Sequence, residues 1–249
     1  MYRNLLVPVE RSDACVEAIG HAAELAHSLG ASITFVCRES ATNDTAAQHR
    51  RQEALLARAQ AAARAQGVPA SVLAQYGDMA FASRDYDLVC IAHGGAVPPL
   101  PGVAVLVCPS DARPAVANVV GALLDVHRAR SDAYDQALAA ARPKRLEARM
   151  IDALRAAHRE EEALTLALRE RTSSLDAELD ELARLAEREA ALLDRAASLP
   201  PGDAAMEDTL HSCARFAWER MGRIEGVVLP AARRYLRDAD WNALACKTR

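Results

Sequence analysis

The change of hydrophobic period near residue 114 constrains the fold of this chain more than any other feature. Before that point, short apolar runs alternate with segments whose apolar residues recur at helical spacing. After it, only long helical segments with one polar face remain. Because strands and helices bury their side chains with different periods, we predict an α/β domain over residues 1–113 and an all-helical domain over residues 114–249.

The first domain is predicted to contain a five-stranded sheet. The runs expected to form its strands are mostly apolar and are separated by helical segments, which is typical of a parallel sheet covered on both faces. These runs are 4–9, 32–37, 70–74, 87–92 and 103–108. A helix over 13–29 is expected to begin after Ser12 and to end at Gly30, and a second helix is expected over 45–66. We therefore predict a doubly wound α/β fold.

The second domain is predicted to be an up-down four-helix bundle. Its helical segments are amphipathic and are separated by short breaks, a pattern typical of such bundles. The expected helices span about 115–141, 145–171, 174–198 and 204–236.

Composition excludes several classes of protein. The chain is 51% hydrophobic and 26% charged, as in ordinary globular proteins, and its net charge is −4. Because it has no basic stripe, nucleic acid and anionic membranes are not expected as partners. No apolar run approaches the ~20 residues of a spanning helix. Residues 1–9 lack a signal-peptide pattern and the six cysteines form no C-x-x-C pair, so we expect a cytoplasmic protein.

Several motifs of the first domain resemble the universal stress protein family. NLLVPV at 4–9 is followed by Glu10-Arg11-Ser12 and a helix, which resembles the start of such a domain. DYDLVCIAHGG at 85–95 and VAVLVCP at 103–109 resemble its fourth and fifth strands. The resemblance covers nearly all of residues 1–109, and it implies a fold that often binds an adenine nucleotide such as ATP or AMP.

The resemblance also implies where the nucleotide would bind. Family members that bind it have an acidic residue after the first strand and a glycine-rich loop after the fourth, where backbone N–H groups approach phosphate. The matching candidates here are Glu10, Ser12, His93, Gly94 and Gly95. However, no second Gly-Ser/Thr follows, and the prolines of the 96–101 segment donate no N–H. We predict a degenerate site, and a Gly/Pro turn that binds nothing is the alternative.

The segment FAWERMGRIEGVVLPAARRYLRDADW, residues 216–241, resembles the last helix of hemerythrin-like bundles. The resemblance implies an iron centre whose ligands on this helix are a histidine and a carboxylate. Arg220 and Ile224 stand at those two positions, and neither side chain can bind a metal. The packing residues of the motif are present while its ligands are replaced.

The other helices retain part of the implied ligand set. His127 and Glu160 match ligand positions, whereas Ala156 and Ala186 stand where histidines are expected. Because two donors do not hold iron tightly, the metal site is predicted to be incomplete.

Four alternatives remain for the centre of this bundle. His127 could be a hydrogen-bonded or partly exposed helix histidine, with the glutamates at 160–162 on a solvated face. A shift of register would pair His158 with Glu162. Arg220 could instead enter the metal's place and pair with Glu160 or another carboxylate. Finally, the residues that replace ligands could simply make the centre apolar.

These observations predict a non-enzymatic protein of the bacterial stress-response type that acts through protein–protein contacts. The chain contains no nucleophile–base constellation that we can place. The family resemblance suggests a homodimer paired through the fifth strand, Val103–Cys108, and no bound cofactor is expected. The alternative is a residual sensor that binds an adenine nucleotide in the first domain or iron in the second.

Overall fold

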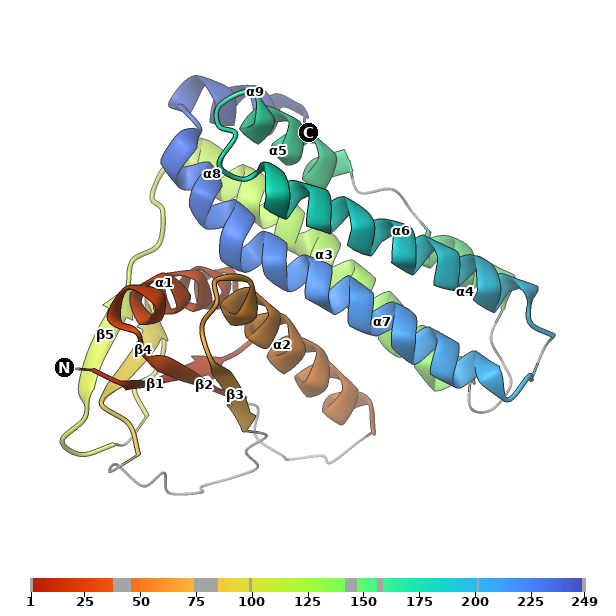
Figure 1. The fold of residues 1–249 in the computed structure, drawn as a ribbon, viewed down its shortest axis with the longest axis horizontal. Helices are drawn as coiled ribbons and strands as arrows, with labels where there is room; N and C mark the ends of the chain where they lie inside the picture. The colour runs from red at the N-terminus through yellow and green to blue at the C-terminus, as the bar shows by residue number, and fades with distance from the viewer. Residues whose placement is uncertain are drawn as a thin grey trace. The chain divides into compact units, whose positions relative to one another are not determined.

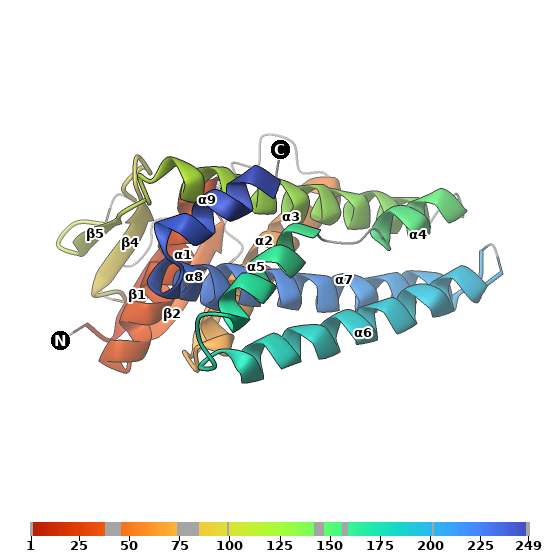
Figure 2. The ribbon, with the colours of Figure 1, turned by 90° about the horizontal axis from the view of Figure 1, so that it is seen from above.

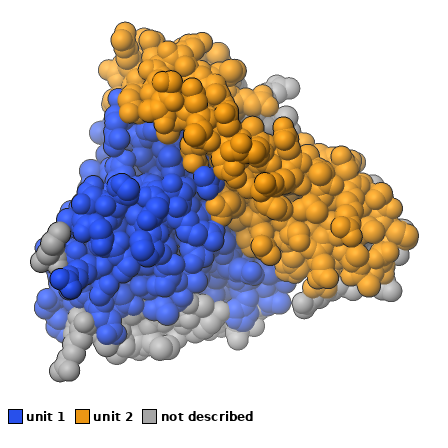
Figure 3. Space-filling view, in the orientation of Figure 1, with its two compact units in different colours: residues 1–112, 222–234 blue, residues 113–221, 235–249 orange. Residues whose placement is uncertain are grey.

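The structure, a computed structural model, describes residues 2–37, 46–73, 85–98, 100–141, 147–155, 159–200 and 202–247. The chain forms two compact units, which Figure 3 distinguishes by colour. Unit 1 comprises residues 1–112 and 222–234, and unit 2 comprises residues 113–221 and 235–249. The sequence placed one boundary at residue 113, whereas the structure also assigns 222–234 to the first unit.

Unit 1 is built on a five-stranded parallel sheet, as predicted. The strand order is β3-β2-β1-β4-β5. The strands are β1 (Asn4–Val9), β2 (Ser32–Cys37), β3 (Ala70–Leu73), β4 (Leu88–Ala92) and β5 (Ala104–Cys108). The register of β1 on β2 runs from Asn4 opposite Ser32 to Val9 opposite Cys37. Each predicted strand is present, and its described bounds lie within one residue of those expected; Ala74, the expected end of the third strand, lies outside the described residues.

Two helices of unit 1 connect consecutive strands, α1 (Asp13–Leu29) and α2 (Ala46–Ala65). The hydroxyl of Ser12 accepts the N–H of Cys15 at 3.2 Å and so fixes the start of α1. Gly30 ends the helix with a left-handed φ of 64°. Both helices lie on the same face of the sheet (Figure 1).

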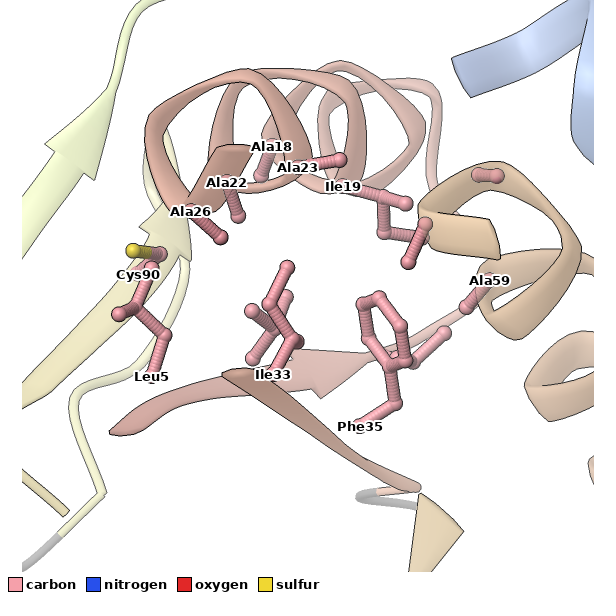
Figure 4. Packing of buried hydrophobic residues seen from close by; sticks show 14 of the residues in the cluster. Leu5, Ala18, Ile19, Ala22, Ala23, Ala26, Ile33, Phe35, Ala59 and Cys90 are labelled. Atoms are coloured by element: carbon pink, nitrogen blue, oxygen red, sulfur yellow. The ribbon is translucent and has the colours of Figure 1, made fainter. Parts of the chain in front are cut away.

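Alternation along the strands creates two apolar layers. Leu5, Ile33, Phe35 and Cys90 of the strands point toward the helices (Figure 4). They pack there against the alanine-rich side of α1 and against Ala59 of α2. Small alanine side chains let the helix lie close to the sheet, so the strand residues fill the space below it.

The other face of the sheet buries a second, smaller cluster. Its strand residues alternate with those of the first layer. The cluster consists of Leu6, Val36, Val89, Ile91 and Leu100, with Tyr86 and Val103 packed against it. The connection from β4 to β5 covers this face, and its described residues contain no helix. Its prolines and glycines disfavour a helix there.

All the regular elements in the described residues of unit 2 are helices. Its helices are α3 (Pro114–Ala141), α4 (Ala148–Leu154), α5 (Arg159–Arg169), α6 (Asp176–Ser198), α7 (Ala205–Arg223, whose last two residues belong to unit 1) and α9 (Asp238–Lys247). The predicted second helix over 145–171 thus corresponds to the shorter α4 and α5. Figures 1 and 2 both show α6 and α7 running side by side. Among the described residues, no helix has the length and apolar character needed to cross a membrane.

The predicted fourth helix changes type along its length. After α7, residues Ile224–Val228 form a π-helix, η1, and α8 follows over Leu229–Tyr235. A π-helical turn inserts one residue into the helical ladder and therefore rotates the side chains that follow it. The change coincides with the passage of the chain into unit 1 at residue 222.

Candidate functional site: a buried charge network in the helical unit

Unit 2 buries a set of ionisable and hydroxyl side chains from four of its helices. They are His127, Arg130 and Tyr134 of α3, Glu161 of α5, Glu189 of α6 and Arg220 of α7. None of them exposes more than 9% of its surface. Because a buried charge is costly unless it is paired, the contacts among these side chains matter for the stability of the unit.

The network residues occupy positions of the apolar stripes of their helices. On α3, His127 and Arg130 continue the spacing that buries Leu123 and Tyr134. On α6, Glu189 lies between the buried Leu185 and Leu193. Helix periodicity therefore places these polar side chains inside the bundle, although nothing in their chemistry favours burial.

Arg220 and Glu161 form one centre of the network. The guanidinium of Arg220 donates to the Glu161 carboxylate, and its Nε lies 3.7 Å from Oε2 of Glu189. Nε2 of His127 lies 3.2 Å from Oε1 of Glu161. Glu161 thus has an arginine and a histidine as neighbours from two different helices.

Glu189 forms the second centre. Its carboxylate accepts hydrogen bonds from the Arg130 guanidinium and from the Tyr134 hydroxyl. The Arg130 guanidinium also lies over the Tyr134 ring, 5.9 Å from its centroid. Two guanidinium groups therefore face two carboxylates in the interior of unit 2, which balances their charge.

Burial and the charge of Glu189 raise the pKa of one network residue and of a nearby thiol. Burial, and then the charge of Glu189, raises the pKa of the Tyr134 hydroxyl above its ordinary range. Burial, followed by the charge of Glu189, also raises the pKa of the Cys213 thiol to about 12. Both groups therefore keep their protons at neutral pH, and Tyr134 acts as a hydrogen-bond donor.

The carboxylate that the structure places beside His127 differs from the predicted one. His127 is buried as a metal ligand would be, but the carboxylate beside it belongs to Glu161 and not to Glu160, which is only partly buried. One residue step turns a helix by about 100°, and Glu161 shares the face of Leu164 and Leu168. In the described part of the chain, no group of three or more His, Cys, Asp or Glu is arranged to hold a metal ion.

The residues that replace ligands have different environments. Arg220 pairs with a carboxylate, as one of the alternatives proposed, and that carboxylate belongs to Glu161. Ala186 is partly buried on α6, and Ile224 is buried within unit 1 and not in the bundle. Ala156 and His158 lie outside the described residues.

Arg130, Tyr134, Glu161 and Glu189 are network residues that the sequence did not single out. The signal that could have identified them is a charged or hydroxyl side chain in place of an aliphatic one within an apolar stripe. Such a signal marks a buried polar position but does not name its partner, because the partners lie on other helices.

The predicted nucleotide residues lie in unit 1, in two groups at the ends of β1 and β4. Ser12 donates to Oε1 of Glu10 at 3.1 Å while it caps α1. His93 and Gly94 are exposed in the turn after β4, and Gly94 has a φ of 74°. A Cβ atom on Gly95 would lie 3.0 Å from the carbonyl oxygen of Ala92, so a side chain there would be tightly packed against the turn.

The sheet topology brings the two groups to one edge. β1 and β4 are parallel neighbours, with Leu5 opposite Leu88, so their carboxyl ends point the same way. Ligands of open α/β sheets bind outside this edge, where the strand order reverses. A nucleotide site at this edge remains a prediction. The Ser12 hydroxyl already caps α1.

Comparison with known proteins supports the resemblance of the first unit. The family model described as "Universal stress protein family" matches residues 1–96. Among solved structures, a protein from the universal stress protein family from Burkholderia pseudomallei is similar, with 17% identity and a TM-score of 0.35, over 44% of this chain and 97% of that one. No curated protein matches the chain. The hemerythrin-like resemblance of unit 2 remains a prediction, whereas the universal stress protein resemblance has a family match over residues 1–96.

Proposed function

We propose that this chain is a non-enzymatic, cytoplasmic stress-response protein that acts through protein–protein contacts as a homodimer. The observation that supports the homodimer is the exposed edge of the sheet in unit 1. β5 ends the strand order, and its Val105, Leu106 and Val107 expose 43%, 37% and 51% of their surfaces. An apolar edge strand is an association hazard unless something covers it, and a second β5 related by a two-fold axis would cover it with its own edge.

Size-exclusion chromatography with light scattering tests the homodimer. The wild-type chain is expected to elute as a dimer at micromolar concentration, and Val107→Lys is expected to elute as a monomer because a lysine on each edge brings like charges together. Val72→Lys is the matched control, since Val72 lies on β3 at the opposite edge and exposes 39% of its surface. A wild-type monomer, or equal dissociation by both substitutions, would overturn the assignment.

We further propose that unit 2 is a hemerythrin-like bundle in which a guanidinium takes the place of a metal. The position of Arg220 between Glu161 and Glu189, beside His127, supports this. Two carboxylates and an imidazole are the donors that a divalent cation prefers. Here a covalently attached cation faces the same groups, so the bundle would not need metal to balance its charges.

A sensor is the second candidate function. The location of Glu10 and of Gly94 at the carboxyl ends of neighbouring strands favours a nucleotide in unit 1. A ligand that binds only the folded state raises the melting temperature, by an amount that grows with its concentration. Thermal-shift measurements with millimolar ATP, AMP or Fe(II) distinguish the two functions: the non-enzymatic contact protein predicts no shift, and the sensor predicts a shift that Glu10→Ala abolishes for the nucleotides.

A further inference from the structure

Residues 222–234 form part of unit 1 although about a hundred residues separate them from its last strand. The segment comprises the end of α7, the π-helix η1 and most of α8. It packs against both helices of the sheet layer: Pro230 meets Gly20 of α1, and Gly226 meets Ala62 of α2. The helical layer of unit 1 therefore has three components, and the third comes from the C-terminal part of the chain.

The segment approaches α2 more closely than any side chain would allow. A Cβ atom on Gly226 would lie 2.2 Å from the Cβ atom of Ala62, and one on Gly222 would lie 2.3 Å from the carbonyl oxygen of Arg58. These separations are far below van der Waals contact, and the obstacles are backbone and alanine atoms that cannot rotate away. Glycine is required at both positions because of this close approach.

A buried ion pair fixes the segment in register. Glu225 exposes 5% of its surface, and its carboxylate accepts from Nε of Arg58 at 3.2 Å and from the terminal nitrogen of the same guanidinium. Such two-point pairing orients both planar groups as well as balancing their charge. If the segment left, the Arg58 guanidinium would lose this partner within the helical layer.

A further hydrogen bond joins unit 1 to the backbone of the π-helix. Nε2 of Gln66 donates to the carbonyl oxygen of Gly226 at 2.6 Å. At the rim, Arg233 pairs with Glu17 at 2.5 Å and Arg234 pairs with Glu24 at 3.0 Å. The Arg234–Glu24 pair is exposed and contributes little. The position of the segment on α2 is therefore set mainly by the glycine contacts and the buried Arg58–Glu225 pair.

We infer that the α1–α2 face of unit 1 is a docking surface for one helical segment, residues 222–234 of the same chain, and that the sheet of unit 1 stays native only while this segment is docked. The surface recognises closely spaced glycines, one carboxylate and one backbone carbonyl. Because the segment is continuous with α7, folding of the first unit depends on the C-terminal part of the chain. This dependence holds whether or not the chain dimerises or binds a ligand.

Amide hydrogen exchange of the full-length chain, resolved by mass spectrometry, tests the inference. Gly226→Ala is expected to speed exchange of the β1, β2 and β4 amides by about tenfold or more, because their protection requires the docked segment. Amides of α6, in unit 2, provide the internal reference. Adding Ala62→Gly removes one obstructing atom, but the Cα atom of residue 62 would still lie 2.7 Å from the new Cβ atom. The double variant is therefore expected to recover only part of the lost protection.

Two further variants keep the experiment decisive. Arg215→Ala changes an exposed residue of α7 and is expected to leave exchange unchanged throughout. If Gly226→Ala fails to fold, Glu225→Gln replaces it, since the amide keeps the shape of the carboxylate and loses its charge. The inference is overturned if either docking variant speeds exchange within 222–234 while β1, β2 and β4 remain as protected as in the wild type.

Discussion

At the scale of single residues, the burial of charge distinguishes this chain from an ordinary pairing of a sheet and a bundle. Arg58 with Glu225 in unit 1, and Arg220 with Glu161 in unit 2, are each buried ion pairs. A buried pair is weak evidence of stability in itself, because desolvation offsets the attraction. Its consequence is specificity, since only the native arrangement of helices satisfies both partners.

Removal of the Arg220 guanidinium is expected to destabilise unit 2 strongly. Arg220→Met leaves the buried Glu161 carboxylate without its arginine, which typically costs about 3–5 kcal/mol. The measurement is the free energy of unfolding in urea. Arg184→Met is the matched control, because it breaks an ion pair to Glu181 in which the arginine side chain is 57% exposed, and a loss below about 1 kcal/mol is expected there. Equal losses of unfolding free energy in the two variants would show that Arg220 does not form a buried ion pair with Glu161.

At the scale of elements, the start of α9 illustrates how one side chain joins separate segments. The Asp240 carboxylate accepts from Nε and Nη2 of Arg171 at 2.9 and 2.6 Å, and from the backbone N–H of Arg237 at 2.9 Å. These bonds tie the end of the α5 region to the first turn of α9, where the helix dipole also favours a carboxylate. The fully buried Trp241 follows directly.

The contribution of Asp240 is expected to depend on pH. The hydrogen bond from Arg171, and then that from the Arg237 N–H, lowers the pKa of Asp240 from its ordinary value of 3.8. A carboxyl whose folded-state pKa is depressed stabilises the fold above its unfolded pKa, and this stabilisation is lost as pH falls through the folded value. Asp240→Asn should therefore lower the melting temperature at pH 7, and the difference from wild type should shrink below pH 3.8.

Asp238→Asn provides the comparison for that measurement, because the Asp238 side chain is 79% exposed in its pair with Arg113. It is expected to change the melting temperature little at any pH. If the melting-temperature difference between Asp240→Asn and wild type stays constant from neutral to acidic pH, the ionised Asp240 carboxylate does not stabilise the fold as proposed.

At the scale of the whole molecule, the two units are not two consecutive stretches of chain. The first crossing between units falls at residue 113, near the change of period in the sequence, whereas the crossings at residues 222 and 235 have no composition or period change to mark them. Helical periodicity is the same whether a helix packs in a bundle or on a sheet layer, so it cannot tell which core a helical turn belongs to. The glycines at 222 and 226, which leave no side chain in the contact with α2, were the available sign.

The sequence by itself determined the local structure of this protein. Continuous apolar runs located β1 and β2 to the residue, and the capping groups Ser12 and Gly30 located both ends of α1, because these signals lie within the segments they define. Only the tertiary structure decided the partners of the buried charges. Glu161 rather than Glu160 meets His127, and Glu225 meets an arginine 167 residues away. Each choice depends on which face of one helix another helix covers, and that relation is not contained in either segment alone.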